Sequence, residues 1–186
     1  MSGLTRRSVV LSGGAALGLA ACGNGLGGDG AAKLDARVDA ARDYLASTYP
    51  GTRDLAAKAV GVLYVPLVTE AGIITFGGSY GQGALRINGA TVDYYSATQA
   101  SVGLQIGAQQ YAHALFFMTP EALSEFRTAP GWVAGANMAY ALPDQGGSLG
   151  VDTTTSLAPV IALVYGQSGF IAGAKVTGTK YTRIIP

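Results

Sequence analysis

Hydrophobic and polar positions follow two different periods along this chain. Over residues 33–49, apolar side chains recur every three or four positions, which predicts an amphipathic helix. A second, shorter helix is expected over residues 52–59, after Pro50-Gly51 ends the first. From Val60 on, β-branched and aromatic residues dominate, which is typical of strands. The change of period indicates a short helical part followed by a larger β part.

The apolar stripe of the 33–49 helix has two interpretations. In one, the stripe covers a β-sheet, and in the other it inserts into a membrane. Acidic and basic residues balance on the remaining faces of the helix. This balance favours the first interpretation, because helices that lie in a membrane surface are usually rich in lysine and arginine.

The segment FGGSYGQG, residues 76–83, raises the question of a nucleotide-binding loop, since four of its eight residues are glycine. A loop that cradles phosphate presents its amides at the N-terminus of a helix. Here the segment runs instead into ALRI and then Asn88-Gly89, a strong signal for a two-residue hairpin. The sequence therefore argues against a nucleotide site.

The rest of the chain continues as strands with one inserted helix. Residues 100–118 and 132–142 are strand-like, and a helix is expected from Thr119-Pro120 through Phe126, because threonine caps helices and proline suits the first turn. Residues 143–156 are polar and predict a loop. Three final strand-like runs, 158–165, 170–178 and 181–185, predict a three-stranded meander.

These elements predict an α+β fold. We expect a twisted, mainly antiparallel sheet or partial barrel, with the N-terminal helices and the one inserted helix packed on it. The composition agrees, because 49% hydrophobic residues and 28 glycines suit a compact β-rich domain and exclude a disordered chain. A formal net charge of +1 gives no electrostatic argument for a nucleic acid partner.

The first residues indicate an export signal. Arg6 and Arg7 precede an apolar stretch that is too short to remain in a bilayer as a span. The segment TRRSVVL resembles a twin-arginine export signal, and Leu-Ala-Ala-Cys at residues 19–22 resembles a bacterial lipobox. The lipobox implies cleavage before Cys22 and attachment of acyl chains, such as palmitate, to it. A plain secretory signal with an incidental cysteine is the alternative.

Three parts of the chain follow from this reading. Residues 1–21 are the signal peptide, residues 22–32 are the acylated cysteine with a flexible tether, and residues 33–186 form the folded domain. Acyl chains on Cys22 would hold the domain on the periplasmic side of a membrane in the cell envelope. Cleavage removes two of the twelve basic residues and none of the eleven acidic ones, which leaves a net charge of −1.

Residues with catalytic or metal-binding chemistry form no recognisable set. His113 is the single histidine, and the sequence pattern assigns no nucleophile or orienting carboxylate to it. We therefore expect a structural or surface role. Asp144 and Asp152 flank a glycine-rich loop without matching a calcium-binding pattern. We therefore predict no enzymatic activity, no metal and no cofactor.

The clustered cations lie near the C-terminus, in KVTGTKYTR. Alternation along one strand would place several of Lys175, Lys180 and Arg183 on one face, as a small patch that binds a lipid headgroup. An edge strand protected by solvated lysines is the other interpretation.

Five segments, taken in order, resemble the SYLF family of lipid-binding domains. The similarity covers residues 34–185 and implies lipid binding, with phosphoinositide binding in eukaryotic relatives and actin binding in yeast. Two departures are Tyr95-Ser96-Ala97-Thr98, where relatives often carry Trp-Ser-x-Pro, and YGQS at residues 165–168, where Tyr-Ser-x-Ser is usual. The five segments are KAVGVLYVP, AGIITFGGSYGQGAL, SVGLQIGAQ, TPEALSEF and YGQSGFIAGAKVTGTK.

Two functions remain open. The first is a non-catalytic domain of an exported, lipid-anchored bacterial envelope protein that binds lipid or a membrane surface, with membrane phospholipid as its partner. The second is a structural or assembly module whose strands pair with another envelope protein or with a second copy. A bacterial envelope argues against actin as a partner, and the charge-balanced N-terminal helix argues against phosphoinositide specificity.

Overall fold

The computed structural model of the chain describes residues 28–73, 76–102, 107–135, 138–143, 149–150, 157–169 and 176–186. The expected signal peptide with Arg6 and Arg7, the acylation site Cys22 and the cation Lys175 lie outside these residues. In chain order, the elements are α2 Gly30–Thr48, α3 Gly51–Lys58, β1 Gly61–Ile73, β2 Phe76–Ile87, β3 Ala90–Val102, β4 Gly107–Phe117, α4 Pro120–Thr128, β5 Trp132–Val133, β6 Met138–Pro143, β7 Leu149–Gly150, β8 Val160–Gly169 and β9 Lys180–Ile184.

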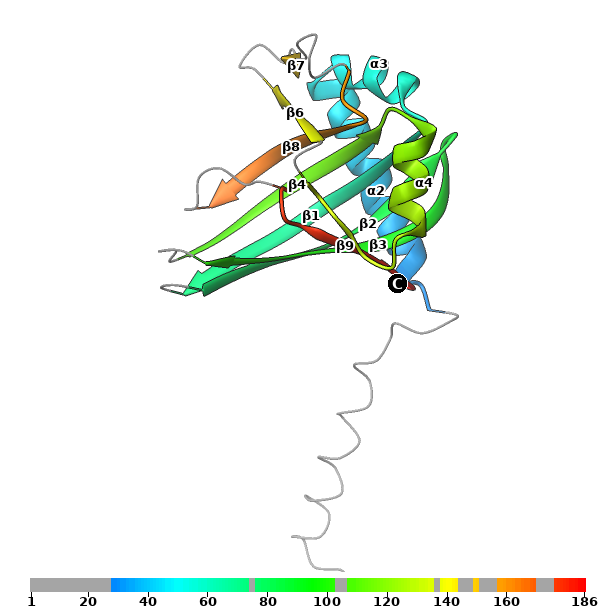
Figure 1. The fold of residues 1–186 in the computed structure, drawn as a ribbon. Helices are drawn as coiled ribbons and strands as arrows, with labels where there is room; N and C mark the ends of the chain where they lie inside the picture. Colours follow the sequence, from blue (N-terminus) through cyan, green and yellow to red (C-terminus); the bar gives the residue numbers. More distant parts are fainter. Residues whose placement is uncertain are drawn as a thin grey trace, which may run out of the picture.

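The described strands form one strongly curled sheet, a half barrel (Figure 1). Their order is β5-β9-β3-β2-β1-β4-β8-β6-β7, and neighbours are antiparallel except for β6 and β8. Helices α2 and α4 cover opposite faces of the sheet (Figure 1). The α+β fold predicted from the sequence, with N-terminal helices and one inserted helix on a mainly antiparallel partial barrel, is confirmed.

Asn88 and Gly89 form the hairpin that the sequence predicts between β2 and β3. Both residues have a positive φ, 51° for Asn88 and 81° for Gly89. This backbone matches the right-handed twist of the flanking strands, and asparagine and glycine are the residues that adopt it at low cost. The glycine-rich segment 76–83 lies within β2, so it is strand backbone, as expected.

Glycines in β2 permit a bulge in the central strand β1. Val65 and Pro66 together oppose the single residue Gly83, so the register shifts between Tyr64 and Leu67. A Cβ on Gly83 would collide with the Tyr64 carbonyl oxygen and lie 2.8 Å from Cγ2 of Val65. The bulge also explains how a proline occupies a central strand, because it lacks the N–H that a regular ladder requires.

The apolar stripe of α2 is buried against the sheet. Leu34, Val38, Ala41 and Leu45 have exposed fractions of 9% or less and face a cluster from β1, β2, β4 and β8. Of the two interpretations of this stripe, sheet covering is therefore the one that the structure supports. Among the described helices, none combines the length and apolar character that a membrane crossing needs.

Helix α4 packs on the other face through Phe126. Its side chain is fully buried and contacts the rings of Tyr95, Phe117, Trp132 and Tyr181. The Thr119 hydroxyl accepts a hydrogen bond from the Ala122 amide, so threonine caps the helix as the sequence predicts.

The strand pairings at the end of the chain differ from the prediction. The expected C-terminal meander is wrong, because β8 lies between β4 and β6 whereas β9 lies between β3 and β5. The run at residues 132–142 is likewise two strands: β5 is at one end of the sheet, and β6 is next to the other end. A local pattern identifies a strand but not its partner, which depends on contacts far apart in the sequence.

Candidate functional site

Lys180 and Arg183, two of the three predicted lipid-binding cations, lie on opposite faces of β9. The strand begins only at Lys180, and the preceding residues turn at Gly178, whose φ is +84°. Residues three positions apart in a strand point to opposite sides. Arg183 is therefore on the face that carries α4, as is the buried Tyr181, and Lys180 is on the other. The sequence predicts that the cations of KVTGTKYTR lie in one strand, with side chains that alternate between its faces. The turn at Gly178 interrupts that strand, so the predicted shared face does not form.

Arg183 belongs to a charged cluster on the α4 face. Its Nε lies 3.3 Å from Oδ1 of Asp93, and Nε of Arg127 lies 3.0 Å from Oδ2 of the same carboxylate. Arg183 also donates a hydrogen bond of 3.1 Å to the Arg127 carbonyl oxygen. The Asp93 side chain is only 12% exposed, whereas the side chains of Arg127 and Arg183 are 41% and 53% exposed. Two accessible cations thus share one shielded anion, which leaves one positive charge in excess.

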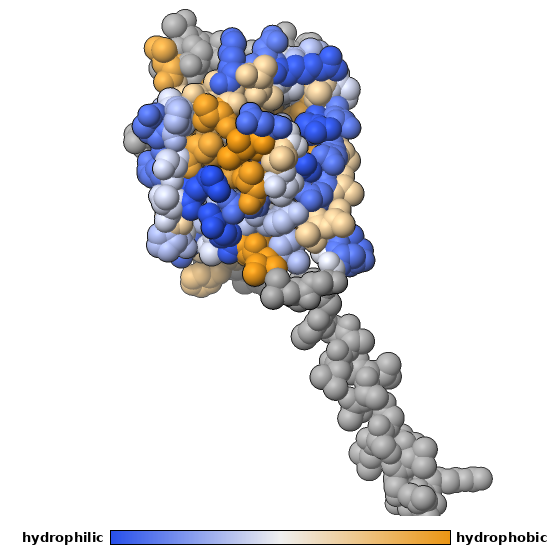
Figure 2. All heavy atoms as spheres, turned by 90° about the vertical axis from the view of Figure 1, so that its right-hand side faces the viewer, coloured by the Kyte–Doolittle hydropathy of each residue, from blue (hydrophilic) through white to orange (hydrophobic). Residues whose placement is uncertain are grey.

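An apolar depression adjoins these arginines. On the side of the molecule that carries α4, apolar side chains gather among polar ones (Figure 2). One hollow there has a volume of about 380 Å³ and combines apolar side chains with hydroxyls and both guanidinium groups. We call it the α4 depression; it is lined by Val60, Pro120, Leu123, Ser124, Arg127, Thr128 and Arg183.

The other flank of α4 has the opposite charge. Glu121 and Glu125 line a second hollow of about 410 Å³, together with Trp132 and Met138. The helical period separates the two flanks, because residues 120, 123, 124, 127 and 128 share one side of the helix and 121, 122 and 125 the other. An anion approaching α4 is therefore attracted to the arginine flank alone.

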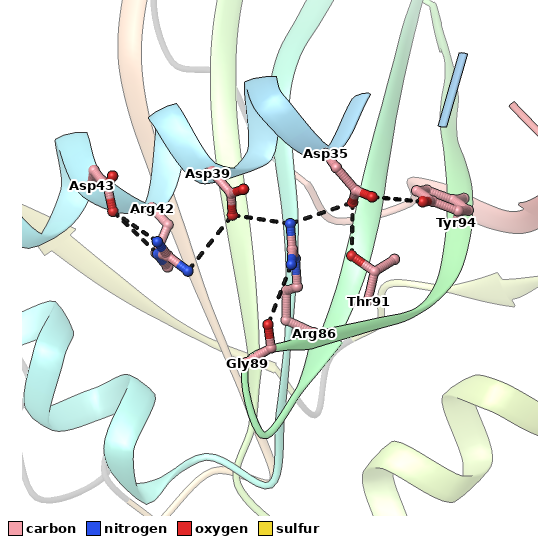
Figure 3. A network of polar contacts seen from close by, with 8 residues as sticks. All are labelled: Asp35, Asp39, Arg42, Asp43, Arg86, Gly89, Thr91 and Tyr94. Carbon is pink, nitrogen blue, oxygen red and sulfur yellow. Dashed lines mark hydrogen bonds and ion pairs between the residues drawn. The ribbon is translucent and has the colours of Figure 1, made fainter. Parts of the chain in front are cut away.

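A polar network ties α2 to the β2–β3 hairpin (Figure 3). Asp35 accepts hydrogen bonds from the Thr91 hydroxyl at 2.7 Å, the Tyr94 hydroxyl at 2.8 Å and the Arg86 guanidinium at 3.3 Å. Arg86 also reaches Asp39 at 3.0 Å. Burial, followed by the hydrogen bond to Asp35, raises the pKa of Tyr94, so its hydroxyl keeps the proton that it donates. The network holds the apolar face of α2 on the sheet.

Replacing Asp35 should loosen this helix. We expect Asp35→Ala to lower the free energy of unfolding by about 2 kcal/mol, because it removes three hydrogen bonds and leaves Arg86 with a single carboxylate partner. Asp43→Ala is the matched control, since Asp43 is 70% exposed and, among the described residues, pairs with Arg42 alone; it should cost less than about 0.5 kcal/mol. Urea denaturation of both variants measures the difference, and equal losses would contradict the role given to the network.

His113 is completely buried in the core of the α4 face. Its Nε2 lies 2.8 Å from the Tyr181 hydroxyl, and its Nδ1 has no hydrogen-bond partner among the described residues. Burial lowers the pKa of His113 to about 3 and raises that of Tyr181 well above its usual value, so both side chains are neutral at physiological pH. The structural role expected for His113 therefore agrees with its position.

Sequence reasoning found Arg183 but missed its partners. Arg127 is in α4, one residue beyond the predicted end of that helix at Phe126, and Asp93 is in the strand after the Asn88-Gly89 hairpin, 34 residues earlier. Nothing in the local pattern joins them, because β3 meets β9 and α4 only in the folded chain. Within the described ranges, no three histidine, cysteine, aspartate or glutamate residues gather around a metal site.

Residues 98–183 match a known protein family, whose model is described as Ysc84, Las17-binding protein actin regulator. The match includes β4, α4 and β8, and with them Arg127 and Arg183 of the α4 depression. Asp93 lies just before it. No curated protein matches the chain.

Proposed function

Because residues 98–183 are of the SYLF (Ysc84) family, as the sequence resemblance predicts, we propose that this domain binds the surface of a membrane without catalysing a reaction. The family match suggests a binding module for lipids or actin-related partners. In our proposal the partner is an anionic phospholipid, and the protein is exported and anchored to the bacterial cell envelope through acylated Cys22. The α4 depression is the observation that carries this proposal.

The chemistry of the α4 depression suits a phospholipid headgroup. Guanidinium groups bind phosphate through paired hydrogen bonds, and Arg127 and Arg183 are both accessible at the rim. Val60, Pro120 and Leu123 supply apolar surface beside them, where the boundary between headgroups and acyl chains would lie. A surface with this combination binds anionic lipid even in a domain of net charge near zero, because the attraction is local.

The edges of the described sheet do not decide between lipid binding and strand-pairing assembly. The end strands β5 and β7 are each only two residues long, and such strands offer few unpaired backbone groups to another chain. However, β6 pairs with Val160–Leu163 alone, so the rest of β8 has no partner on that side among the described strands. We favour lipid as the partner because of the α4 depression, and the assembly module stays the alternative.

Co-sedimentation with vesicles rich in phosphatidylglycerol tests the proposal. All variants carry Cys22→Ser in the full-length chain, so that an acyl anchor does not mask headgroup binding. We expect Arg183→Gln to weaken binding about fivefold, since one cation near an anionic surface contributes about 1 kcal/mol. Asp93 keeps Arg127 as its partner in this variant, so the fold should persist.

Lys180→Gln is the matched control, because it removes the same charge from the opposite face of the same strand. Its binding should equal that of the parent chain, and added salt should weaken the binding of both. If Lys180→Gln alone weakened binding, the lipid contact would lie on the face opposite α4, and the role given to the α4 depression would be wrong. Absence of binding at every anionic lipid content would refute the proposal.

A further inference from the structure

Two β-bulges, one in β1 and one in β8, lie on either side of the same part of β4. In β1 the register shifts between Val65 and Val68 relative to β4, and in β4 it shifts between Gln110 and Ala112 relative to β8. At the second shift Gly166 of β8 has a positive φ of 63°. Bulges bend a sheet and are frequent beside binding sites. Here they lie beneath the second half of α2.

The bend leaves a groove between α2 and the sheet. Its volume is about 460 Å³, and a smaller hollow of about 160 Å³ continues it toward Tyr80, with Arg37, Pro66 and Leu67 common to both. We call the two together the α2 groove. Side chains that line it include Arg37, Ala41 and Tyr44 of α2 and Pro66, Leu67 and Tyr165 of the sheet.

Large apolar and aromatic side chains that line the α2 groove are exposed to solvent. Tyr44 is 46% exposed, Leu67 45% and Tyr80 53%. Three of them along one groove form a contiguous apolar surface, which in a monomeric protein marks a binding site more often than chance exposure does. The two hollows adjoin at Arg37, Pro66 and Leu67, so together they offer a longer surface that suits a chain.

Two polar groups of the α2 groove have no partner within the part of the chain that the structure describes. The Tyr165 hydroxyl is buried, in a side chain only 4% exposed, and it makes no hydrogen bond among the described residues. The ring of Tyr44 stacks over the Tyr165 ring at 6.0 Å. Arg37, at the rim, has no ion-pair partner within the described ranges. The Tyr165 hydroxyl has almost no exposed surface, so a ligand in the groove meets the aromatic rings, whereas the exposed Arg37 guanidinium can meet an anionic group.

We propose that the α2 groove binds the single acyl chain of an anionic amphiphile, with the chain against Leu67 and Tyr44 and the head near Arg37. Fatty acids and lysophospholipids share this chemistry. The apolar lining supplies the affinity for the chain, and the lone guanidinium supplies the preference for a negative head. This site lies on the α2 face and is separate from the α4 depression, so it does not depend on the function proposed above.

Calorimetric titration of the full-length Cys22→Ser chain tests the site, with laurate and with a lauroyl lysophosphatidylglycerol below their micellar concentrations. We expect one molecule bound per chain. Leu67→Glu should weaken binding at least tenfold, because it places a charge among apolar groups. Arg37→Gln should weaken binding of both probes about fivefold. Tyr165→Phe should change it little, because the hydroxyl that it removes is not exposed to the groove. Val133→Glu, at an exposed apolar side chain outside the groove, should change nothing.

Circular dichroism confirms that each variant is folded before its affinity is compared. Saturable binding of laurate alone identifies a fatty acid site, whereas binding of both probes identifies recognition of the shared anionic chain. Absence of saturable binding by either probe overturns the inference, and so does equal binding by Leu67→Glu and the parent chain. Vesicle co-sedimentation tests the proposed function separately. If the protein sediments with vesicles but binds neither probe, the proposed function stands and the inference about the α2 groove is wrong.

Discussion

Lowering the pH from 7 to 4.5 should destabilise this protein by about 2.5 kcal/mol through one residue, His113. Its pKa is about 3 in the folded chain, where burial beside Tyr111 and Tyr181 disfavours the charged ring, and 6.5 is the ordinary value. Between these two values the unfolded chain binds a proton that the folded chain does not. Stability is therefore complete above pH 6.5 and falls by about 1.4 kcal/mol per pH unit below it.

Urea denaturation at pH 7, 6, 5 and 4.5 measures this slope. The interpretation is unusually direct, because the chain has a single histidine and the ordinary pKa values of its carboxyl groups lie below most of this range. The control is His113→Gln, which should be less stable than the parent chain at pH 7 but nearly insensitive to pH between 7 and 5. If the parent chain is equally stable at pH 7 and pH 5, His113 is not held neutral in the core.

Gly83→Ala should lower the free energy of unfolding by about 3 kcal/mol or more. The added Cβ collides with the Tyr64 carbonyl oxygen and lies 2.8 Å from Cγ2 of Val65. Neither neighbour is the free end of a flexible side chain, because one is backbone and the other is in the buried core. The bulge at Pro66 brings β1 this close, so relief requires shifting β1 and thus the middle of the sheet.

Gly135→Ala is the matched control for this substitution. A Cβ on Gly135 has no neighbour closer than 3.9 Å, so the free energy of unfolding should change by less than about 0.5 kcal/mol. Chemical denaturation of the two variants gives the comparison. A Gly83→Ala protein as stable as the Gly135→Ala protein would mean that β1 and β2 are not packed as closely as described.

The sequence predicts well those elements of this fold that depend on interactions between residues close together in the chain. Residues 33–49 show a helical stripe, Asn88-Gly89 demands a tight hairpin, and Thr119-Pro120 begins a helix; each is found at its predicted place. The pairing of the last strands could not be predicted from such local signals. β9 pairs with β3, so that Thr98 lies opposite Lys180, and no pattern within either strand specifies the other.

The same limit applies to the candidate site. Arg183 stands out in the sequence because cations are few, but its usefulness depends on Asp93 and Arg127, which only the fold brings to it. The α2 groove was missed for a related reason. Pro66 and Gly166 each suggest an irregularity in one strand, whereas the groove arises because the irregularities lie on either side of the same part of β4.

The position of β9 also determines the order in which this protein can be completed during synthesis. This strand follows all the other described strands in the chain, yet it lies beside β3 and supplies the Tyr181 partner of buried His113. Until β9 is in place, the aromatic core on the α4 face is open on the side of β3. Closure of that core therefore waits until β9 has left the ribosome, and a nascent chain must be kept from aggregating through that surface until then.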